Sequence, residues 1–223
     1  MNLKLSGIEH IIDCGNSAYI NSVVIESPRL LCEVLMDLEC QIQGDDGKSV
    51  VSENDKVLPT AKCLEVHTRF VPFELNQKNL INKATAKLIE IALDEENYMQ
   101  SSELVGDLER YLMNLSIGLT GSIDTSKVSI ENLIKNSGLT FVDDYSLLSE
   151  KLLDYFELVR EYDQDKIFVL LNLRSFLSTN ELQQFVDEIL LRRFQVVLIE
   201  STEYSLLDKE KRLLIDDSLC EIC

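Results

Sequence analysis

The segment from Lys166 to Ser201 constrains the fold of this chain more than any other. It begins with the apolar run Ile167–Leu171, whose length and β-rich content predict a strand buried on both faces. Ser178 and Glu181 have the spacing of a capping box, and the helix predicted after them has one apolar stripe. A second apolar run, Val196–Ile199, follows at once. This order predicts a βαβ unit with parallel strands and a right-handed crossover.

The rest of the chain predicts an α/β head that is interrupted by helices. Short strands are expected near the N-terminus, up to Ile25, and Ser27 with Pro28 predicts the start of a helix. From about Asn76 the pattern changes to long amphipathic helices, followed by a brief strand at Leu139–Val142. We therefore expect a discontinuous α/β head with a mainly parallel sheet, formed by residues 1–74 and 162–223. A helical leg of residues 75–161 is inserted into it.

The charge of the chain argues against simple attraction to nucleic acid. Acidic residues outnumber basic ones 39 to 21, which gives a formal net charge of −18. A nucleic-acid site would need its lysines and arginines gathered on one surface. Four of the six cysteines are scattered, and Cys220 and Cys223 form a lone CxxC that is a poor zinc or redox motif. The start does not resemble a signal peptide, and no run of eighteen apolar residues occurs. These features predict a cytoplasmic protein with reduced thiols and no membrane segment.

Two segments invite comparison with a phosphate-binding loop, and neither fits it. Gly44–Ser49 ends in Gly-Lys-Ser, but Ile42 stands where the first glycine is needed, and a predicted helix precedes it. A surface turn is expected there. The turn Ile25–Arg29 lies between strand and helix, where such a loop belongs, yet it has no glycine and no lysine. Glu26 would repel a phosphate, and Pro28 lacks a donor. The pattern predicts a nucleotide-binding architecture with a disabled site.

No catalytic constellation emerges from the other polar residues. His10 and His67 are far apart in sequence and lie in predicted strands, so structural roles are expected for both. The lysines of the helical segment are more suggestive, although each could also merely solvate a helix face. Lys83 and Lys87 are one turn apart on one helix, Lys127 and Lys135 flank a shorter one, and Lys151 lies on the next.

The C-terminal third of the chain resembles the Csn-type adaptation proteins of type II-A CRISPR systems, the second of the Csn series. The shared pattern is a strand running into an asparagine, a small-residue turn, a Phe-Leu-Ser helix start, and a second strand that ends in a glutamate before an aromatic residue. The residues that carry it are Asn172, Arg174-Ser175, Phe176–Ser178, Glu200 and Tyr204. Similar order continues upstream through residues 128–139 and 23–35.

The resemblance implies a degenerate P-loop-type head with a helical leg. It further implies a homotetrameric ring that threads the ends of double-stranded DNA without sequence preference. Such a ring would act in spacer acquisition beside the CRISPR integrase pair and the effector nuclease. In this picture Lys135 is the first DNA-binding candidate, with Lys127, Lys83, Lys87 and Lys151 beside it. Phosphate contacts would give affinity without base readout.

Calcium is the weak point of the resemblance. Relatives hold it in an acidic loop before the third helix. The corresponding segment here, Leu119–Thr125, keeps only Asp124 with three hydroxyl residues. A calcium ion prefers six to eight oxygen ligands, so this segment serves it poorly, and no cofactor is expected to be required.

Three functions stay open at this point. The first is a non-enzymatic ring that binds double-stranded DNA. The second is a nucleotide-hydrolysing enzyme related to ABC or SMC ATPase heads, against which the missing glycines and lysine argue. The third is a purely protein-binding scaffold, which the charge of −18 favours.

Overall fold

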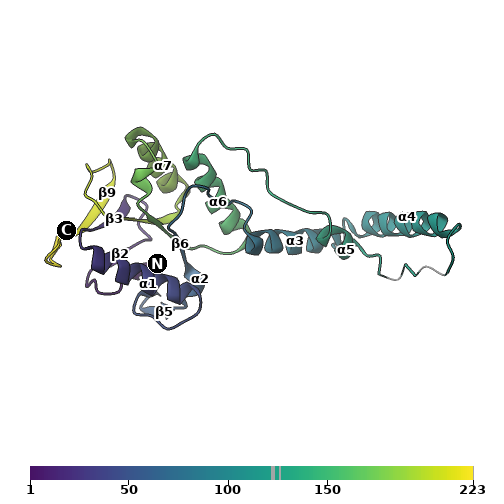
Figure 1. Ribbon diagram of the computed structural model, residues 1–223, viewed down its shortest axis with the longest axis horizontal. Helices are drawn as coiled ribbons and strands as arrows, with labels where there is room; N and C mark the ends of the chain where they lie inside the picture. Colours follow the sequence, from purple (N-terminus) through teal and green to yellow (C-terminus); the bar gives the residue numbers. More distant parts are fainter. Residues whose placement is uncertain (122–123, 126, 223) are drawn as a thin grey trace. The chain divides into compact units, whose positions relative to one another are not determined.

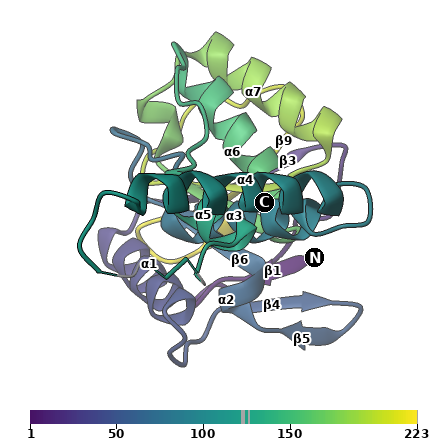
Figure 2. The ribbon, with the colours of Figure 1, turned by 90° about the vertical axis from the view of Figure 1, so that its right-hand side faces the viewer.

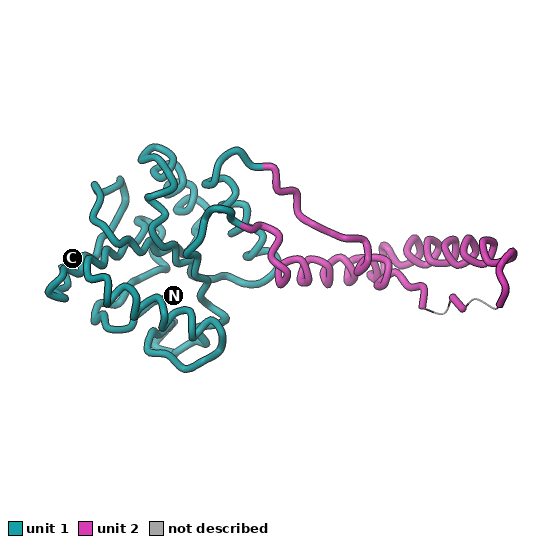
Figure 3. The backbone as a smooth tube through the Cα atoms, in the orientation of Figure 1, with its two compact units in different colours: residues 1–73, 145–223 teal, residues 74–144 magenta. Residues whose placement is uncertain are grey.

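The computed structural model describes residues 1–121, 124–125 and 127–222, which form two compact units (Figure 3). Unit 1 consists of residues 1–73 and 145–223, and unit 2 of residues 74–144. The expected leg of residues 75–161 is thus longer than unit 2. The difference is helix α6 (Leu148–Tyr162), which belongs to unit 1 because it buries Leu152, Tyr155 and Phe156 there.

Unit 1 is built on a six-stranded, mainly parallel sheet in the order β10-β9-β3-β8-β7-β6. Neighbouring strands from β9 to β6 run parallel, and β10 alone in this sheet pairs antiparallel. The strands are β3 (Ile20–Ile25), β6 (Leu64–His67), β7 (Ile167–Leu171), β8 (Gln195–Glu200), β9 (Glu210–Ile215) and β10 (Glu221–Ile222). The predicted α/β class with a mainly parallel sheet is confirmed.

The βαβ unit predicted from the sequence forms β7, α7 (Thr179–Arg192) and β8, with a short 3-10 turn, η1 (Leu173–Ser175), before the helix. β7 and β8 pair in parallel, with Val169 opposite Val197. The capping box is complete, because Ser178 and Glu181 each bond to the other's backbone amide. Sequence signals of these two kinds, buried strand runs and helix caps, therefore located the centre of the fold.

The two faces of the parallel sheet are covered differently (Figures 1 and 2). On one face α6 and α7 pack through aromatic rings: the Phe156 ring is stacked on Phe168, with centroids 3.9 Å apart, and tilted against Phe185, with centroids 6.2 Å apart. The other face shares a core with helix α1 (Pro28–Ile42), in which Val34 and Leu38 are fully buried.

A second, antiparallel sheet of order β2-β1-β4-β5 also joins the α1 side of the core. Its strands are β1 (Asn2–Lys4), β2 (Ile11–Asp13), β4 (Val50–Glu53) and β5 (Lys56–Leu58), and the short helix α2 (Thr60–Cys63) follows. The N-terminal strands expected from the sequence therefore lie outside the parallel sheet, apart from β3. The β4–β5 hairpin was not predicted.

Unit 2 contains helices α3 (Lys78–Ala92), α4 (Tyr98–Ser116) and α5 (Ile130–Lys135). α5 packs against both α3 and α4. The brief strand expected at Leu139–Val142 does not form; that segment has no regular structure. Within the described parts of the chain, no helix is both long and apolar enough to cross a membrane.

Candidate functional site

The turn between β3 and α1 occupies the place where P-loop proteins bind phosphate, at the carboxyl ends of parallel strands. The Glu26 amide donates to the Ile215 carbonyl at 3.0 Å, and the Leu30 amide donates to the Ser27 hydroxyl. Pro28 has no N–H to offer. Two amides are therefore engaged by the chain itself, and the carboxylate of Glu26 would repel a phosphate.

The carboxyl ends of β7 and β8 are likewise held together by hydrogen bonds within the chain. Asn172 follows β7 in the left-handed region, with φ 51°. Its side-chain oxygen accepts from the Ser201 amide at 2.8 Å, and its own amide donates to the Ile199 carbonyl at 2.8 Å. Asn172 carries no negative charge and its side-chain oxygen already accepts one hydrogen bond, so it is a weaker ligand than the carboxylates that a magnesium ion prefers. Among the residues described, no group of three His, Cys, Asp or Glu side chains could hold a metal ion.

The Gly44–Ser49 segment is a turn whose amides are bound by a carboxylate of the same chain. Asp37 on α1 accepts from the amides of Lys48 at 2.6 Å and Ser49 at 2.8 Å. Burial would raise the pKa of Asp37, but the hydrogen bonds from Ser49 and Lys48 outweigh it and lower that pKa. A side chain on Gly47 would lie 2.3 Å from Gln41. The segment follows α1, so the expectation of a surface turn holds.

His67 has the structural surroundings that the sequence predicted. It is buried on β6 among the rings of Phe73, Tyr155 and Phe168. Its Nε2 lies 3.5 Å from Glu65 Oε1. The cavity beside Phe168 measures about 10 Å³, which is too small for a ligand.

The five candidate lysines are divided between the two units. Lys83 and Lys87 lie on α3, Lys127 lies before α5, and Lys135 is the last residue of α5. These four belong to unit 2. Lys151 lies on α6 and therefore in unit 1, although the sequence placed it in the helical leg.

Lys135 lies on an open groove between α3 and α5 with a volume of about 490 Å³. Asn82 and Thr85 of α3 bring an amide and a hydroxyl to the same groove. The Thr85 hydroxyl donates to the Ile81 carbonyl at 2.7 Å. Glu131 lies one turn before Lys135 on α5, so the groove also has a carboxylate near it. The groove thus combines an exposed ammonium group with neutral polar groups.

Lys83 and Lys87 do not face this groove. Successive residues of a helix are rotated by about 100°, so these two lysines point roughly 130–170° away from the side formed by Asn82 and Thr85. They share a face, as predicted from their spacing. Lys87 forms an exposed ion pair with Glu90 at 3.0 Å. Within unit 2, Lys83 and Lys87 therefore lie on a different side of α3 from the groove that Lys135 lines.

Unit 1 contains a buried ionic cluster that was not predicted from the sequence. Arg174 Nη2 lies 2.6 Å from Glu210 Oε2, and Arg174 Nε lies 3.9 Å from Glu200. Burial raises the pKa of Glu200 to about 7, against the opposing effect of Arg174. Arg212 contacts Glu210 from its other side at 3.4 Å. These residues come from three elements, so no local spacing could have indicated that they meet.

The exposure of helix α4 is the second feature that was not predicted from the sequence. All of α4 is described, and none of its residues is buried. Leu104, Tyr111 and Leu115 are 55%, 59% and 57% exposed. The spacing indicated an apolar seam, which is present, but no described part of unit 2 covers it along its length.

Together, these features define the class: a P-loop-like α/β head whose phosphate-binding turn is closed by its own chain, with an added helical unit that carries lysines. The family model for the CRISPR-associated protein Csn2 matches residues 41–219. The chain belongs to this family, as its resemblance to the Csn-type proteins predicted.

Solved structures give the fold further context. The crystal structure of Stu0660 of Streptococcus thermophilus is similar, with a TM-score of 0.55 and 11% identity over 91% of this chain and 69% of that one. A protein described as an ABC transporter (ATP-binding protein) from Pyrococcus furiosus has a TM-score of 0.40 and 14% identity, covering 95% and 97% of the two chains. No curated protein sequence matches the chain.

Proposed function

We propose that this protein is a non-enzymatic, sequence-independent binder of double-stranded DNA ends that acts in CRISPR spacer acquisition as a homotetrameric ring. The observation that carries the proposal is the groove of Lys135, Asn82 and Thr85 in a family of CRISPR-associated proteins. The Lys135 ammonium and the Asn82 amide are donors of the kind that bind DNA phosphates, and such contacts carry no sequence information.

A ring reconciles this role with a net charge of −18. Lysines from several copies line the hole, while acidic residues cover the outside. Lys127, Lys83, Lys87 and Lys151 join Lys135 in the proposed DNA path, with contributions from different copies, since α3 turns Lys83 and Lys87 away from the groove of Lys135. The CRISPR integrase pair and the type II effector nuclease are the proposed protein partners, on the strength of the family.

Calcium is not part of the proposal. Ser122 and Ile123 of the segment 119–125 lie outside the described residues, and Asp124 is its one acidic side chain. We propose that DNA binding requires no cofactor. Equal affinities in EDTA and in millimolar calcium would support this, and loss of binding in EDTA would contradict it.

Two rival functions make different predictions. An ABC- or SMC-like ATPase would turn over ATP, which the engaged amides of the β3–α1 turn argue against. A purely protein-binding scaffold is favoured by the exposed apolar stripe of α4 and would be indifferent to DNA.

The first test is a salt titration of binding to linear and to closed-circular duplexes of equal sequence, with the mass in solution measured on the same sample. A tetramer that binds only linear DNA, and releases it steeply as salt rises, supports a ring loaded over ends. Equal binding to both forms keeps DNA binding and rejects threading. A protein that binds neither form rejects the proposal.

The second test substitutes the groove lysine. Lys135→Glu is expected to lower DNA affinity about tenfold or more, and to reduce the salt slope by roughly 0.9 for each phosphate that is no longer neutralised. Lys135→Arg, which keeps the charge, is the matched control and should retain binding. Unchanged binding by Lys135→Glu would remove this groove from the DNA path.

A further inference from the structure

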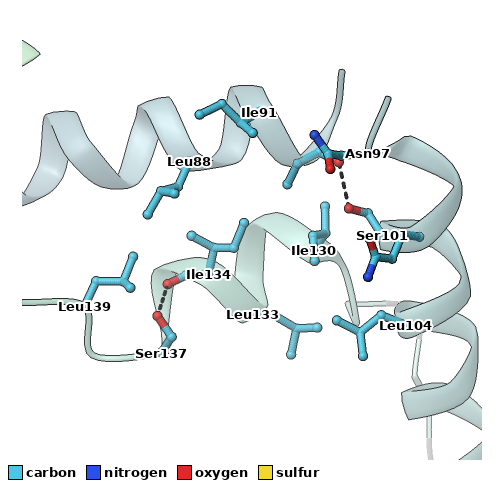
Figure 4. A pocket seen from close by; sticks show the side chains of 12 residues that line it. Leu88, Ile91, Asn97, Ser101, Leu104, Ile130, Leu133, Ile134, Ser137 and Leu139 are labelled. Carbon is cyan, nitrogen blue, oxygen red and sulfur yellow. Dashed lines mark hydrogen bonds between the residues drawn. The ribbon is translucent and has the colours of Figure 1, made fainter. Parts of the chain in front are cut away.

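The two units differ in the kind of side chain that they gather in their interiors and grooves. In unit 2, the open groove of about 480 Å³ among α3, α4 and α5 is lined mainly by apolar side chains, such as Leu88 and Leu104 (Figure 4). In unit 1, charged side chains, among them Arg174 and Glu200, are buried next to residues 201–209. This segment connects β8 to β9 and contains neither a helix nor a strand.

The buried charges lie on the same face of the parallel sheet as α6 and α7. Side chains alternate between the two faces along a strand, and Val23, Ile199 and Leu213 belong to the core shared with α1. The neighbouring side chains on the three strands therefore point to the opposite face: Ser22, Glu200 and Arg212. Where α6 and α7 cover that face the layer consists of aromatic rings, and where residues 201–209 adjoin it the layer is ionic.

Polar contacts hold residues 201–209 in place. The Arg174 guanidinium donates to the Ser205 carbonyl at 3.0 Å, and its Cζ lies over the Tyr204 ring, 5.5 Å from the centroid. The Leu207 amide donates to the Glu210 carboxylate at 2.8 Å. Three more bonds tie the segment to β9 and α7: Glu203 with Arg212, Asp208 with Gln183, and Lys209 with Asp187. All of residues 201–209 are described, and of them only Leu207 is buried.

We propose that residues 201–209 form a detachable strap, which the charge of Glu200 opens and closes and whose release exposes Arg174. This role goes beyond DNA binding and does not depend on it. Separating an apolar layer exposes apolar surface to water, which is costly. Hydrogen bonds, in contrast, are exchanged for bonds to water at a small net cost. The ionic layer therefore lets the strap open locally while the core around α1, α6 and α7 stays folded.

Glu200 is the group of this layer whose surroundings favour a change of charge. Its Oε2 is buried and has no hydrogen-bond partner among the described residues. Its Oε1 accepts from the Arg174 amide at 3.3 Å and lies 3.9 Å from Arg174 Nε. Burial raises the pKa of Glu200 to about 7, against the opposing effect of Arg174. A buried carboxylate oxygen without a partner favours either a proton or water, and water can reach it when the strap opens.

The charged groups nearest to Glu200 keep their charge while it titrates. Burial would raise the pKa of Glu210, but hydrogen bonds from Ser22, Leu207 and Arg174 outweigh it and lower that pKa. The two arginines of the cluster stay protonated, because a guanidinium is not deprotonated in proteins. Near neutral pH the charge of the cluster therefore changes at Glu200.

Other titratable groups lie along the strap. On the α7 side, the hydrogen bond between Lys209 and Asp187 lowers the pKa of Asp187 and raises that of Lys209, which moves both away from neutrality. Glu203 is 55% exposed in its ion pair with Arg212. His10 lines a small cavity that Arg212 also lines. Because histidine also changes its charge near neutral pH, a variant of His10 belongs in the test.

The strap is held most firmly in acidic solution. In the closed state the pKa of Glu200 is about 7, and opening hydrates the carboxyl group and returns that pKa toward its ordinary value of 4.5. Between these two values opening releases a proton, so the opening equilibrium constant rises about tenfold for each pH unit. Above about pH 7 Glu200 is ionised in both states, and the constant levels off.

The experiment follows hydrogen exchange of the full chain between pH 5 and pH 8, corrected for the intrinsic exchange rate at each pH. The amides of Leu207 and Asp208, which bond to Glu210 and Gln183, report on the strap, and the amides of β8 report on the sheet. We expect the opening constant of the strap amides to rise about tenfold per pH unit up to about pH 7, with β8 more protected throughout. Strap amides that are as protected as those of β8 at every pH would overturn the proposal.

Three variants assign the pH dependence. Glu200→Gln removes the titrating group, so it should abolish the slope and leave the strap at pH 7.5 at least tenfold less open than in the unchanged protein. Glu203→Gln, the matched control, makes the same change at an exposed position of the strap and should keep the slope. His10→Gln should keep it too, and circular dichroism checks that all three variants are folded. A slope that survives Glu200→Gln, or that disappears in His10→Gln, would overturn the role of Glu200.

Discussion

Helices α4 and α6 have the same apolar spacing and opposite surroundings. Both stripes are spaced four, three and four residues apart, with a tyrosine in third place: Leu104, Leu108, Tyr111 and Leu115 in α4, and Leu148, Leu152, Tyr155 and Val159 in α6. In α6, Leu152 is 0% and Tyr155 is 1% exposed. In α4 the equivalent residues, Leu108 and Tyr111, are partly or largely exposed.

The comparison teaches that the spacing of apolar residues identifies a helix face that can be buried, but does not identify the part of the molecule that buries it. α6 lies directly before β7 in sequence and packs its Phe156 on Phe168 of that strand. α4 instead belongs to a unit of three helices, in which the six-residue α5 is too short to cover nineteen residues. The stripe of α6 is buried by its own chain, whereas the stripe of α4 stays exposed within the described residues of unit 2.

The largest effect is expected from truncating matched leucines in the two stripes. Leu152→Ala removes a fully buried side chain and should lower the free energy of unfolding by about 2–5 kcal/mol. Leu104→Ala, at a stripe position that is 55% exposed, should cost less than about 1 kcal/mol in dilute protein. Urea unfolding followed by circular dichroism measures both. Equal losses would show that a single chain already covers α4.

A second contrast compares two glutamates of unit 1, one buried and one exposed. The pKa of Glu200 is raised by burial to about 7, so the folded state holds a proton that the unfolded state releases near its ordinary pKa of 4.5. Its contribution to stability is therefore lost as pH rises from about 4.5 to about 7. The expected loss is up to roughly 3 kcal/mol, at about 1.4 kcal/mol for each pH unit.

Glu200→Gln tests this directly, because glutamine does not titrate. The variant should gain stability relative to the unchanged protein between pH 5 and pH 8, by about 2–3 kcal/mol in unfolding free energy. Glu203→Gln, at a position 55% exposed, is the matched control and should change the unfolding free energy at neutral pH by less than about 0.5 kcal/mol. A parallel pH dependence for Glu200→Gln and the unchanged protein would mean that Glu200 is already ionised below neutral pH.

Much of the head was predictable because its signals are local. The runs Ile167–Leu171 and Val196–Ile199 are short, apolar and bounded by turn and cap residues, so strand type and parallel pairing follow from sequence. The β3–α1 turn was recognised as disabled for the same reason, since missing glycines and a proline are visible without a structure. Membership of the Csn2 family was likewise carried by a pattern of contiguous segments.

The features that escaped prediction depend on contacts between distant residues. Arg174, Glu200 and Glu210 meet only after β8 and β9 are placed on either side of β3. The unit boundary was set too late because α6 has the same kind of stripe as the helices of unit 2. Lys135 was singled out, but its neighbours Asn82 and Thr85 were not, since the packing of α5 on α3 brings them together.

The smallest contrast concerns how the helices begin. Ser178 caps α7: its hydroxyl accepts from the Glu181 amide at 3.4 Å, and Glu181 accepts from the Ser178 amide at 2.8 Å. Asn97 precedes α4 without a side-chain bond to its first turn, and its amide group donates instead to Asp94 at 3.0 Å. Ser178→Ala should therefore cost about 1 kcal/mol of unfolding free energy. Asn97→Ala should cost less than about 0.5 kcal/mol.

Thermal unfolding of the two variants beside the unchanged protein measures this difference. A Tm that falls by a few degrees for Ser178→Ala, and by less for Asn97→Ala, fits a head whose helices are fixed by caps and core together. The opposite order would mean that the start of α4 is held by contacts beyond its own unit.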